Sequence, residues 1–388
     1  MVRKVVIALM LSGFLGLLLV ENGSSSVQAA PSNADRALAS YSAMQKYFFV
    51  NDGSLLYQEW YPRSAGDNPY SYLWPFSQAR QATIDLVNLP HKQGQPFNGD
   101  VQQRNQALEH YWNTTGTTGL PGYDSYVRPP YGNGGDKFYD DNAWVGLSDI
   151  QWYNMSKDSF ALARAKQIFA LAVSGWDTDA THPAPGGVFW TQASWSHDRN
   201  TISNMPNAEL GLRLYQITRD QYYFDWAKKM YEWTYAHLLA PNGLFWDHID
   251  LAGNIDKTQW SYNQGVSVGA NVLLFHITGD SSYLQRAEAL TKAALAYYVD
   301  GGRLYTQPPY FNAIFFKNLL LLQSVDRDEH ARQVMQNYAD TTWRTARDTS
   351  TGLFHFSKAD QTYLLEQAGM TQIYTILAWN PDQYKDLY

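Results

Sequence analysis

Apolar residues recur every three to four positions along most of the chain, which is the spacing of one face of an α-helix. Twelve helices are expected, and strand-like runs are short and lie between them. No proline-rich or low-complexity linker separates the helices, so we expect a single domain. The predicted helices span residues 34–50, 72–89, 100–114, 139–154, 157–175, 204–217, 219–238, 260–277, 281–299, 310–325, 327–346 and 364–379.

Two internal repeats divide these helices into hairpins. Segments ending in Asp158, Asp220 and Asp280 align without a gap, and the three Asp residues lie 62 and 60 positions apart. Each segment joins the end of one helix to the start of the next, so the three Asp residues are predicted to cap the second helix. A second repeat, a glycine followed by apolar and aromatic residues, lies in the other set of loops, at Gly53, Gly187, Gly243, Gly302 and Gly352, with a degenerate copy at Gly122.

Six helical hairpins can stack as an open solenoid or close into a double ring. A solenoid requires polar capping repeats at both ends. The last predicted helix, 364–379, is instead mostly small or apolar on every face, as expected of a helix buried on all sides. We therefore predict an all-α (α/α)6 barrel, with the even-numbered helices as the inner ring and the glycine-aromatic loops around its mouth.

Polar and aromatic residues gather at the starts of the predicted inner helices. Individually, Asn, Ser and Asp at such positions are explained by capping and by the helix dipole. Inner helices are expected to be apolar all round, so polar groups at six corresponding ends predict one polar cavity there. These starts contain Trp74, Asp140, Asp141, Asn142, Asn204, Tyr262, Asn263, Gln264, Asn312 and Glu366.

Asp140 and Asp141 are the strongest candidates for chemistry. One Asp is enough for a cap, and a second carboxylate beside it raises the pKa of the first by repulsion. Glycoside hydrolysis requires two such carboxyl groups, one protonated and one ionised. Cα atoms of adjacent residues lie about 3.8 Å apart, which suits the carboxyl separation of about 5–5.5 Å in retaining enzymes better than the wider one in inverting enzymes. We expect retention of anomeric configuration.

Composition narrows the class of protein. Arg3 and Lys4 precede the apolar run 5–20, and a polar region ends at Ala29-Ala30. This pattern is typical of a secretory signal cleaved after Ala29 or Ala30, so residues 1–29 are predicted to be removed and 30–388 to form a secreted catalytic domain without stable membrane insertion.

The chain has no cysteine and a net charge of −7. Thiol chemistry is thereby excluded and nucleic acid is not an expected partner. No metal-binding motif is present, and no cofactor is expected.

The segment Tyr139-Asp140-Asp141-Asn142-Ala143-Trp144 resembles the catalytic signature of glycoside hydrolase family 76, the endo-α-1,6-mannanases. The resemblance extends through the segments 203–215, 243–247, 260–274 and 366–374 and covers most of the mature chain. It implies an (α/α)6 fold and double displacement on α-1,6-linked mannan, with Asp140 as nucleophile and Asp141 as general acid/base. The order within the pair is implied by the resemblance alone.

The resemblance also implies sugar-binding residues. Those carried over are Asn142, Asn204, Tyr262, Asn263, Gln264 and Asp247, and the aromatic candidates for stacking on sugar rings are Trp74, Trp190 and Trp246. For Trp144, deep in its helix, a place in the core is equally expected. Two departures stand out: His248 occupies the position of a glycine, and the segment 309–315 lacks an expected Lys and Gly.

Other classes remain open at this point. A transglycosylase would use the same covalent intermediate with a different acceptor. A sugar epimerase would place His on the inner ring, but the inner-helix starts contain no His. An unsaturated-uronyl hydrolase would need Lys or Arg in the cavity, and these residues are sparse at the same positions. A non-catalytic glycan-binding protein would not need the Asp pair. The expected partner is α-mannan or its oligosaccharides, bound by a monomer.

Overall fold

The computed structural model describes residues 30–90, 97–356 and 360–388. The chain divides into two units, residues 1–31 and 32–388, and everything below concerns the second. The predicted signal, 1–29, lies outside the described residues. Within the described ranges, no helix combines the length and apolarity needed to span a bilayer.

The predicted helices are confirmed, with small shifts at their ends. The segment predicted as helix 100–114 forms a helix only to Leu108, because the chain then makes a 3₁₀ turn and enters a short strand at Trp112. The twelve α-helices of the described chain are α1 (Asn33–Phe48), α2 (Leu73–Val87), α3 (Phe97–Leu108), α4 (Tyr139–Ser156), α5 (Ser159–Ser174), α6 (Thr201–Thr218), α7 (Gln221–Leu238), α8 (Ser261–Thr278), α9 (Ser281–Leu295), α10 (Pro309–Asp326), α11 (His330–Thr345) and α12 (Leu364–Ala378).

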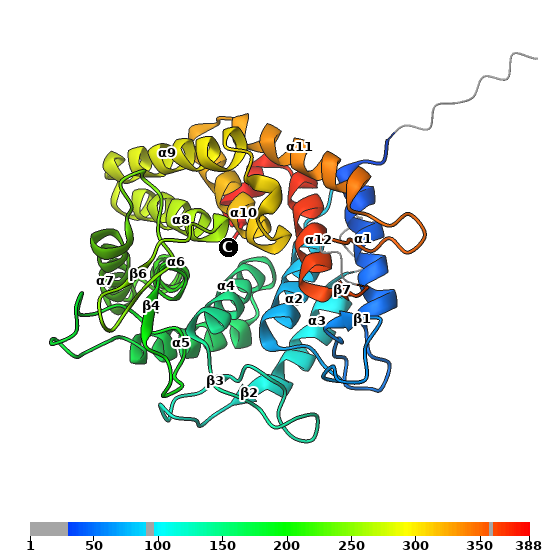
Figure 1. Ribbon diagram of the computed structural model, residues 1–388, viewed down its shortest axis with the longest axis horizontal. Coiled ribbons are helices and arrows are strands. Elements are labelled where there is room, and N and C mark those ends of the chain that lie inside the picture. Colours follow the sequence, from blue (N-terminus) through cyan, green and yellow to red (C-terminus); the bar gives the residue numbers. More distant parts are fainter. Residues whose placement is uncertain (1–29, 91–96, 357–359) are drawn as a thin grey trace, which may run out of the picture. The chain divides into compact units, whose positions relative to one another are not determined.

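The even-numbered helices form a closed inner ring. Along this ring α2 packs on α4, α4 on α6, α6 on α8, α8 on α10, α10 on α12, and α12 again on α2. Each odd-numbered helix lies outside the ring against an even-numbered one, which Figure 1 shows as two concentric layers. The predicted (α/α)6 barrel is therefore confirmed.

Short strands connect the hairpins at the end of the barrel where the inner helices begin. They are β1 (Trp60–Tyr61), β2 (Trp112–Asn113), β3 (Gly122–Tyr123), β4 (Asp198–Asn200), β5 (His248–Asp250), β6 (Ile255–Asp256) and β7 (Thr362–Tyr363). They pair as antiparallel β1–β7, β2–β3 and β4–β5–β6. Strand β4 leads directly into α6, and β7 into α12, so side chains of these strands lie at the mouth of the ring.

The glycine-aromatic repeat marks the turn that brings each loop back over its own hairpin. The five repeated glycines other than the degenerate copy Gly122 adopt positive φ, between 69° and 87°, a region open to glycine but costly for other residues. At Gly187 a Cβ would also lie 2.5 Å from the Trp233 ring, so no larger residue fits there without a shift. The repeat therefore reflects a backbone requirement of the loops.

The inner helices are more polar than the sequence pattern suggested. Lys317 of α10 pairs with Asp85 of α2 at 2.9 Å, and Arg80 of α2 pairs with Asp149 of α4 at 2.5 Å, all four side chains being buried. The expectation of inner helices apolar along their length is thus wrong. Lys317 and Asp85 neutralise each other between two inner helices that are not neighbours in the ring, whereas Arg80 and Asp149 do so between two neighbouring inner helices, where Arg80 also donates to Asn105 of α3. The ring can therefore bury these charges as pairs.

Candidate active site

Asp140 and Asp141 lie in the first turn of α4, at the open mouth of the inner ring. The helix begins after Phe138, whose side chain provides no cap. Asp140 is buried, with 9% of its surface exposed, whereas Asp141 is half-buried. One oxygen of the Asp140 carboxylate accepts a hydrogen bond from the backbone N–H of Asp141 at 2.9 Å, and the other accepts one from Nε1 of Trp190 at 3.2 Å.

The two carboxyl groups have different electrostatic environments. Burial raises the pKa of Asp140, but the N–H donors of Asp141 and Trp190 favour its ionised form and limit that rise. Burial and the charge of Asp140 raise the pKa of Asp141 well above its ordinary value, and no donor in the described chain offsets them. The donors and the direction of both pKa shifts therefore favour the ionised form at Asp140 over the ionised form at Asp141.

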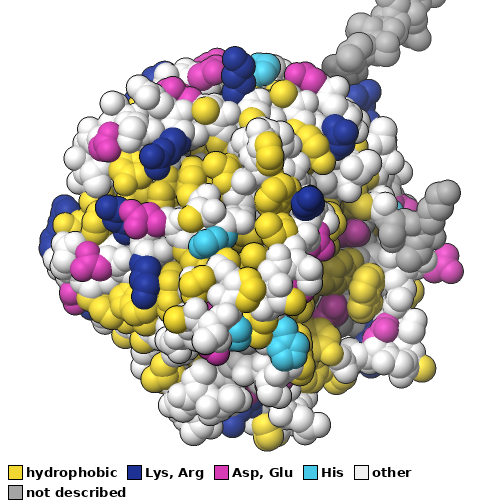
Figure 2. All heavy atoms as spheres, turned by 60° about the vertical axis from the view of Figure 1, so that its left-hand side comes forward, with side chains coloured by type: hydrophobic (Ala, Val, Ile, Leu, Met, Phe, Trp, Pro, Cys, Tyr) yellow, Lys and Arg dark blue, Asp and Glu magenta, His cyan; other side chains and the backbone are white. Residues whose placement is uncertain are grey.

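The pair opens into a cavity of about 710 Å³ at the mouth of the barrel. The face shown in Figure 2 is hollowed right of centre, where hydrophobic and acidic side chains lie together. The lining residues are Glu59, Tyr72, Trp74, Pro75, Ser125, Gly135, Asp136, Phe138, Asp140, Asp141, Trp190, Asp198, Asn200, Ile202, Asp247, His248, Tyr262 and Tyr363.

Aromatic rings form one wall of this cavity. Tyr262 stacks on Phe311 with ring centroids 3.8 Å apart, and Trp74 stacks on the same ring at 5.8 Å. Phe311 belongs to the segment 309–315, whose departures from the family pattern are Asn312 and Ala313, so the ring that supports Trp74 and Tyr262 is one that the pattern keeps. The flat wall is suited to the apolar face of a ligand ring.

Asp247 and His248 form a second polar cluster beside the catalytic candidates. Nδ1 of His248 lies 2.9 Å from one carboxylate oxygen of Asp247, and Nδ2 of Asn263 donates to the other at 3.1 Å. The hydrogen bond to Asp247 raises the pKa of His248. Asn263 is fully buried and acts on the cavity only through Asp247, while His248, which replaces the expected glycine, lines the cavity itself.

Three of the residues predicted to bind sugar lie behind the cavity wall and not in the cavity. Asn142, Asn204 and Gln264 are buried and do not line the cavity. Their carboxamides bind both backbone groups of one loop residue in front of their own helix: Asn142 binds Tyr123, Asn204 binds Val188, and Gln264 binds Phe245. We call these three side chains the loop latches. Their geometry corrects the expectation of direct sugar contacts, because their donors and acceptors are already occupied.

The tryptophans predicted to stack on sugar rings also differ in whether they line the cavity. Trp74 and Trp190 line the cavity, whereas Trp246 does not, and its ring lies 5.5 Å from Nζ of Lys257. Trp144 is 1% exposed and belongs to the hydrophobic core, as its alternative interpretation proposed.

Several cavity residues were not predicted from the sequence. Glu59, Asp136, Asp198, Asn200 and Tyr363 all lie in loops or short strands at the mouth. A sequence signal exists for Asn200 and Tyr363, which directly precede inner helices, but none marks Glu59. Burial raises the pKa of Glu59. The cavity contains six carboxyl groups and, among its lining residues in the described chain, no Lys or Arg.

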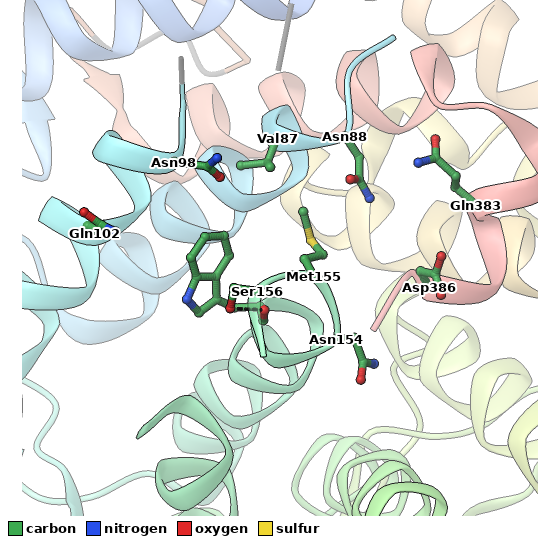
Figure 3. A pocket seen from close by; sticks show the side chains of 10 residues that line it. Val87, Asn88, Asn98, Gln102, Asn154, Met155, Ser156, Gln383 and Asp386 are labelled. Atoms are coloured by element: carbon green, nitrogen blue, oxygen red, sulfur yellow. Dashed lines mark hydrogen bonds between the residues drawn. The ribbon is translucent and has the colours of Figure 1, made fainter. Parts of the chain in front are cut away.

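A second hollow, of about 540 Å³, lies at the opposite end of the barrel. Figure 3 shows Asn88 at the end of α2, Asn154 near the end of α4, and Gln383 and Asp386 of the C-terminal 3₁₀ turn around it. Five of its ten lining residues carry carboxamides, and one carries a carboxyl group. It therefore lacks the paired carboxyl groups found at the mouth.

Comparison with known proteins identifies the relatives of this chain. Residues 32–380 match the model of glycosyl hydrolase family 76. Mannan endo-1,6-alpha-mannosidase DCW1 of Saccharomyces cerevisiae is 30% identical over 146 residues, which are 35% of this chain and 32% of that protein. The alignment thus spans about a third of this curated relative.

Solved structures share the fold. Bt3792 of Bacteroides thetaiotaomicron, a family 76 mannosidase, superimposes with a TM-score of 0.79 at 23% identity, over 89% of this chain and 98% of that one. The α-1,6-mannanase GH76A of Salegentibacter, in complex with α-1,6-mannotriose, gives 0.70 at 20% identity, over 89% and 99%. That structure is of a variant described as inactive, with two consecutive aspartates replaced by asparagine.

Proposed function

Because this chain belongs to glycosyl hydrolase family 76, we propose that it is a retaining endo-α-1,6-mannanase that uses Asp140 and Asp141. The observation that carries the proposal is the unequal environment of two adjacent carboxyl groups in one cavity. Asp140 receives two N–H donors and Asp141 receives none from the described chain, which supports an ionised Asp140 beside a protonated Asp141.

In the first step, a carboxylate oxygen of Asp140 attacks the anomeric carbon of a mannose residue. Asp141 donates its proton to the glycosidic oxygen, so the bond from that oxygen to the anomeric carbon breaks and the leaving sugar departs with a hydroxyl group. The mannose residue is then esterified to Asp140, and Asp141 is ionised. The donors around the pair support this assignment, which agrees with the order implied by the family resemblance.

In the second step, Asp141 accepts a proton from water, whose oxygen attacks the anomeric carbon and releases Asp140 as a carboxylate. Two inversions at the same carbon restore the original α configuration. Both transition states resemble an oxocarbenium ion and carry positive charge on the sugar. Those of the six cavity carboxyl groups that are ionised favour that charge.

The same charge distribution supports a neutral glycan as substrate. An unsaturated uronyl sugar carries a carboxylate, which the ionised carboxyl groups of the cavity would repel, and no Lys or Arg is present among the lining residues of the described chain to bind it. The S. cerevisiae and Salegentibacter relatives are named for activity on α-1,6-linked mannan. We therefore assign α-1,6-mannan as the substrate class.

The proposed organisation of the chain agrees with an extracellular polymer as substrate. Residues 1–29 are proposed to be a secretory signal and 30–388 the catalytic domain, on the basis of the basic, apolar and small-residue order of that segment. Mass spectrometry of the exported protein tests this assignment, with a mature N-terminus at Ala30 or Pro31 as the expected result.

The proposed reaction is tested by incubating the purified chain with unbranched α-1,6-mannan and following the first-formed product by proton NMR. We expect shorter α-1,6-linked oligosaccharides that appear first as the α anomer and mutarotate later. A product that appears first as the β anomer would contradict the double displacement. Products longer than a supplied oligosaccharide would identify transglycosylation in place of hydrolysis.

A further inference from the structure

Trp195 is a large aromatic side chain left exposed beside the active-site cavity. It lies between Trp190, which lines the cavity, and strand β4, and 53% of its surface is exposed. A tryptophan ring in water forgoes the stabilisation that burial would give it, so a fixed, exposed ring next to a binding site suggests that a ligand covers it.

The ring of Trp195 continues the aromatic wall of the cavity outward. Its centroid lies 6.0 Å from Trp190 and 6.2 Å from Phe138, and those two rings lie 5.0 Å apart, edge to face. Trp190 and Phe138 both line the cavity, and Trp190 also donates to Asp140. Trp195 is therefore one ring removed from the reacting group.

The loop that carries Trp195 is held to the segment before α4. The backbone N–H of Gln192 and the hydroxyl of Thr191 both donate to the carbonyl oxygen of Lys137, at 3.1 and 2.9 Å. Within the loop, the N–H of Ser196 donates to the carbonyl of Ala193 at 3.0 Å. These bonds hold the loop that carries Trp195 in place before any ligand arrives, which lowers the entropic cost of binding.

We propose that Trp195 forms an outer sugar subsite, on which a mannose residue of the substrate chain stacks after leaving the cavity. This inference rests on the proposed function. A cavity of about 710 Å³ is the size of a site for a small ligand, so a polysaccharide cut in its interior must extend across the rim. The ring offers a flat, uncharged surface to the C–H face of a sugar, continuous with the wall formed by Trp190.

Tyr305 provides a matched control, because its exposure is also 53%. Its ring stacks on Tyr338 at 5.3 Å, and neither residue lines the cavity. If any exposed aromatic ring affected mannan binding, Trp195→Ala and Tyr305→Ala would have the same effect. Trp195→Phe, which keeps a ring, is expected to fall between Trp195→Ala and the wild type.

The experiment measures kcat/KM on α-1,6-mannan oligosaccharides of increasing length. For Trp195→Ala we expect the ratio of kcat/KM on the longest to that on the shortest cleaved oligosaccharide to fall by roughly 3- to 10-fold, through KM. Tyr305→Ala should keep the wild-type ratio. An equal loss on all lengths, or equal behaviour of the two variants, would overturn the inference and leave the proposed function intact.

A binding measurement separates the two proposals further. The parent is the double variant Asp140→Asn/Asp141→Asn, and its migration through gels containing α-1,6-mannan is measured. The same measurement is made after adding Trp195→Ala to that parent. Unchanged thermal unfolding shows that the added substitution leaves the fold intact. Weaker retardation after loss of Trp195 supports the subsite even if the wild type proves not to hydrolyse mannan. Unchanged retardation, or no retardation of the parent, would overturn it.

Discussion

The two ends of the barrel use the same residue type at helix starts for opposite purposes. At the end far from the cavity, Asp158, Asp220 and Asp280 cap α5, α7 and α9 by accepting backbone N–H groups at 2.9–3.0 Å. Asp220 and Asp280 are exposed and Asp158 is half-buried, and the hydrogen bonds from Ser282 lower the pKa of Asp280. At the mouth, burial instead raises the pKa of Asp140.

The helices at the mouth also begin without caps. In the described chain, none of the six inner helices has a side-chain cap, and four of their N-cap positions hold aromatic residues, at Tyr72, Phe138, Trp260 and Tyr363. A missing cap costs a helix about 1 kcal/mol. The outer helix starts thus contribute to stability, whereas the inner helix starts line or border a cavity. Substitutions that remove an outer cap should therefore lower stability, whereas substitutions of cavity residues at the mouth should lower activity.

The largest effect is expected for the carboxyl pair itself. Asp140→Asn removes the nucleophile and Asp141→Asn removes the proton donor, so each should lower kcat on α-1,6-mannan by at least about 10³-fold. Asp220→Asn makes the same chemical change at the far end, where Asn caps as well as Asp. That variant should keep both wild-type kcat and wild-type stability. A near-wild-type kcat in either mouth variant would remove the pair from the mechanism.

The next effect concerns the loop latches. Asn204→Leu leaves the backbone N–H and carbonyl of Val188 buried without a partner, and we expect the free energy of unfolding to fall by about 2–4 kcal/mol. Urea denaturation measures this loss. If Asn204 instead bound a sugar hydroxyl, the variant would show unchanged stability and a large rise in KM, which would contradict the latch assignment.

A smaller effect is expected for the hydrogen bond from Trp190 to Asp140. Trp190→Phe keeps a ring but removes the N–H that favours the ionised carboxylate, so the pKa of Asp140 should rise. Because attack requires ionised Asp140, the acidic limb of the kcat/KM profile should move to higher pH, with activity lost as the pH falls through the raised pKa. Trp246→Phe, outside the cavity, is the control, and an unshifted limb in Trp190→Phe would show that this hydrogen bond does not tune Asp140.

The sequence predicted those features that depend on local chemistry. The Asp caps and the positive-φ glycines recur because each hairpin repeats the same two turns, and the Asp pair stands out because adjacent carboxyl groups repel each other. The latches were misassigned because a carboxamide at an inner helix start can face the cavity or turn back to its own loop, and both choices give the same pattern. Glu59 and Tyr363 meet at the mouth only after β1 pairs with β7, residues about 300 positions apart.

The central claim is that Asp140 forms the covalent intermediate while Asp141 carries the proton. Trapping tests it most directly: the enzyme is incubated with an activated fluorinated α-mannosyl donor, digested, and its peptides are sequenced by mass spectrometry. We predict one mannosyl adduct per chain, on Asp140, and no adduct in Asp140→Asn. An adduct on Asp141 or on another carboxylate of the cavity, such as Glu59 or Asp247, would contradict the assignment.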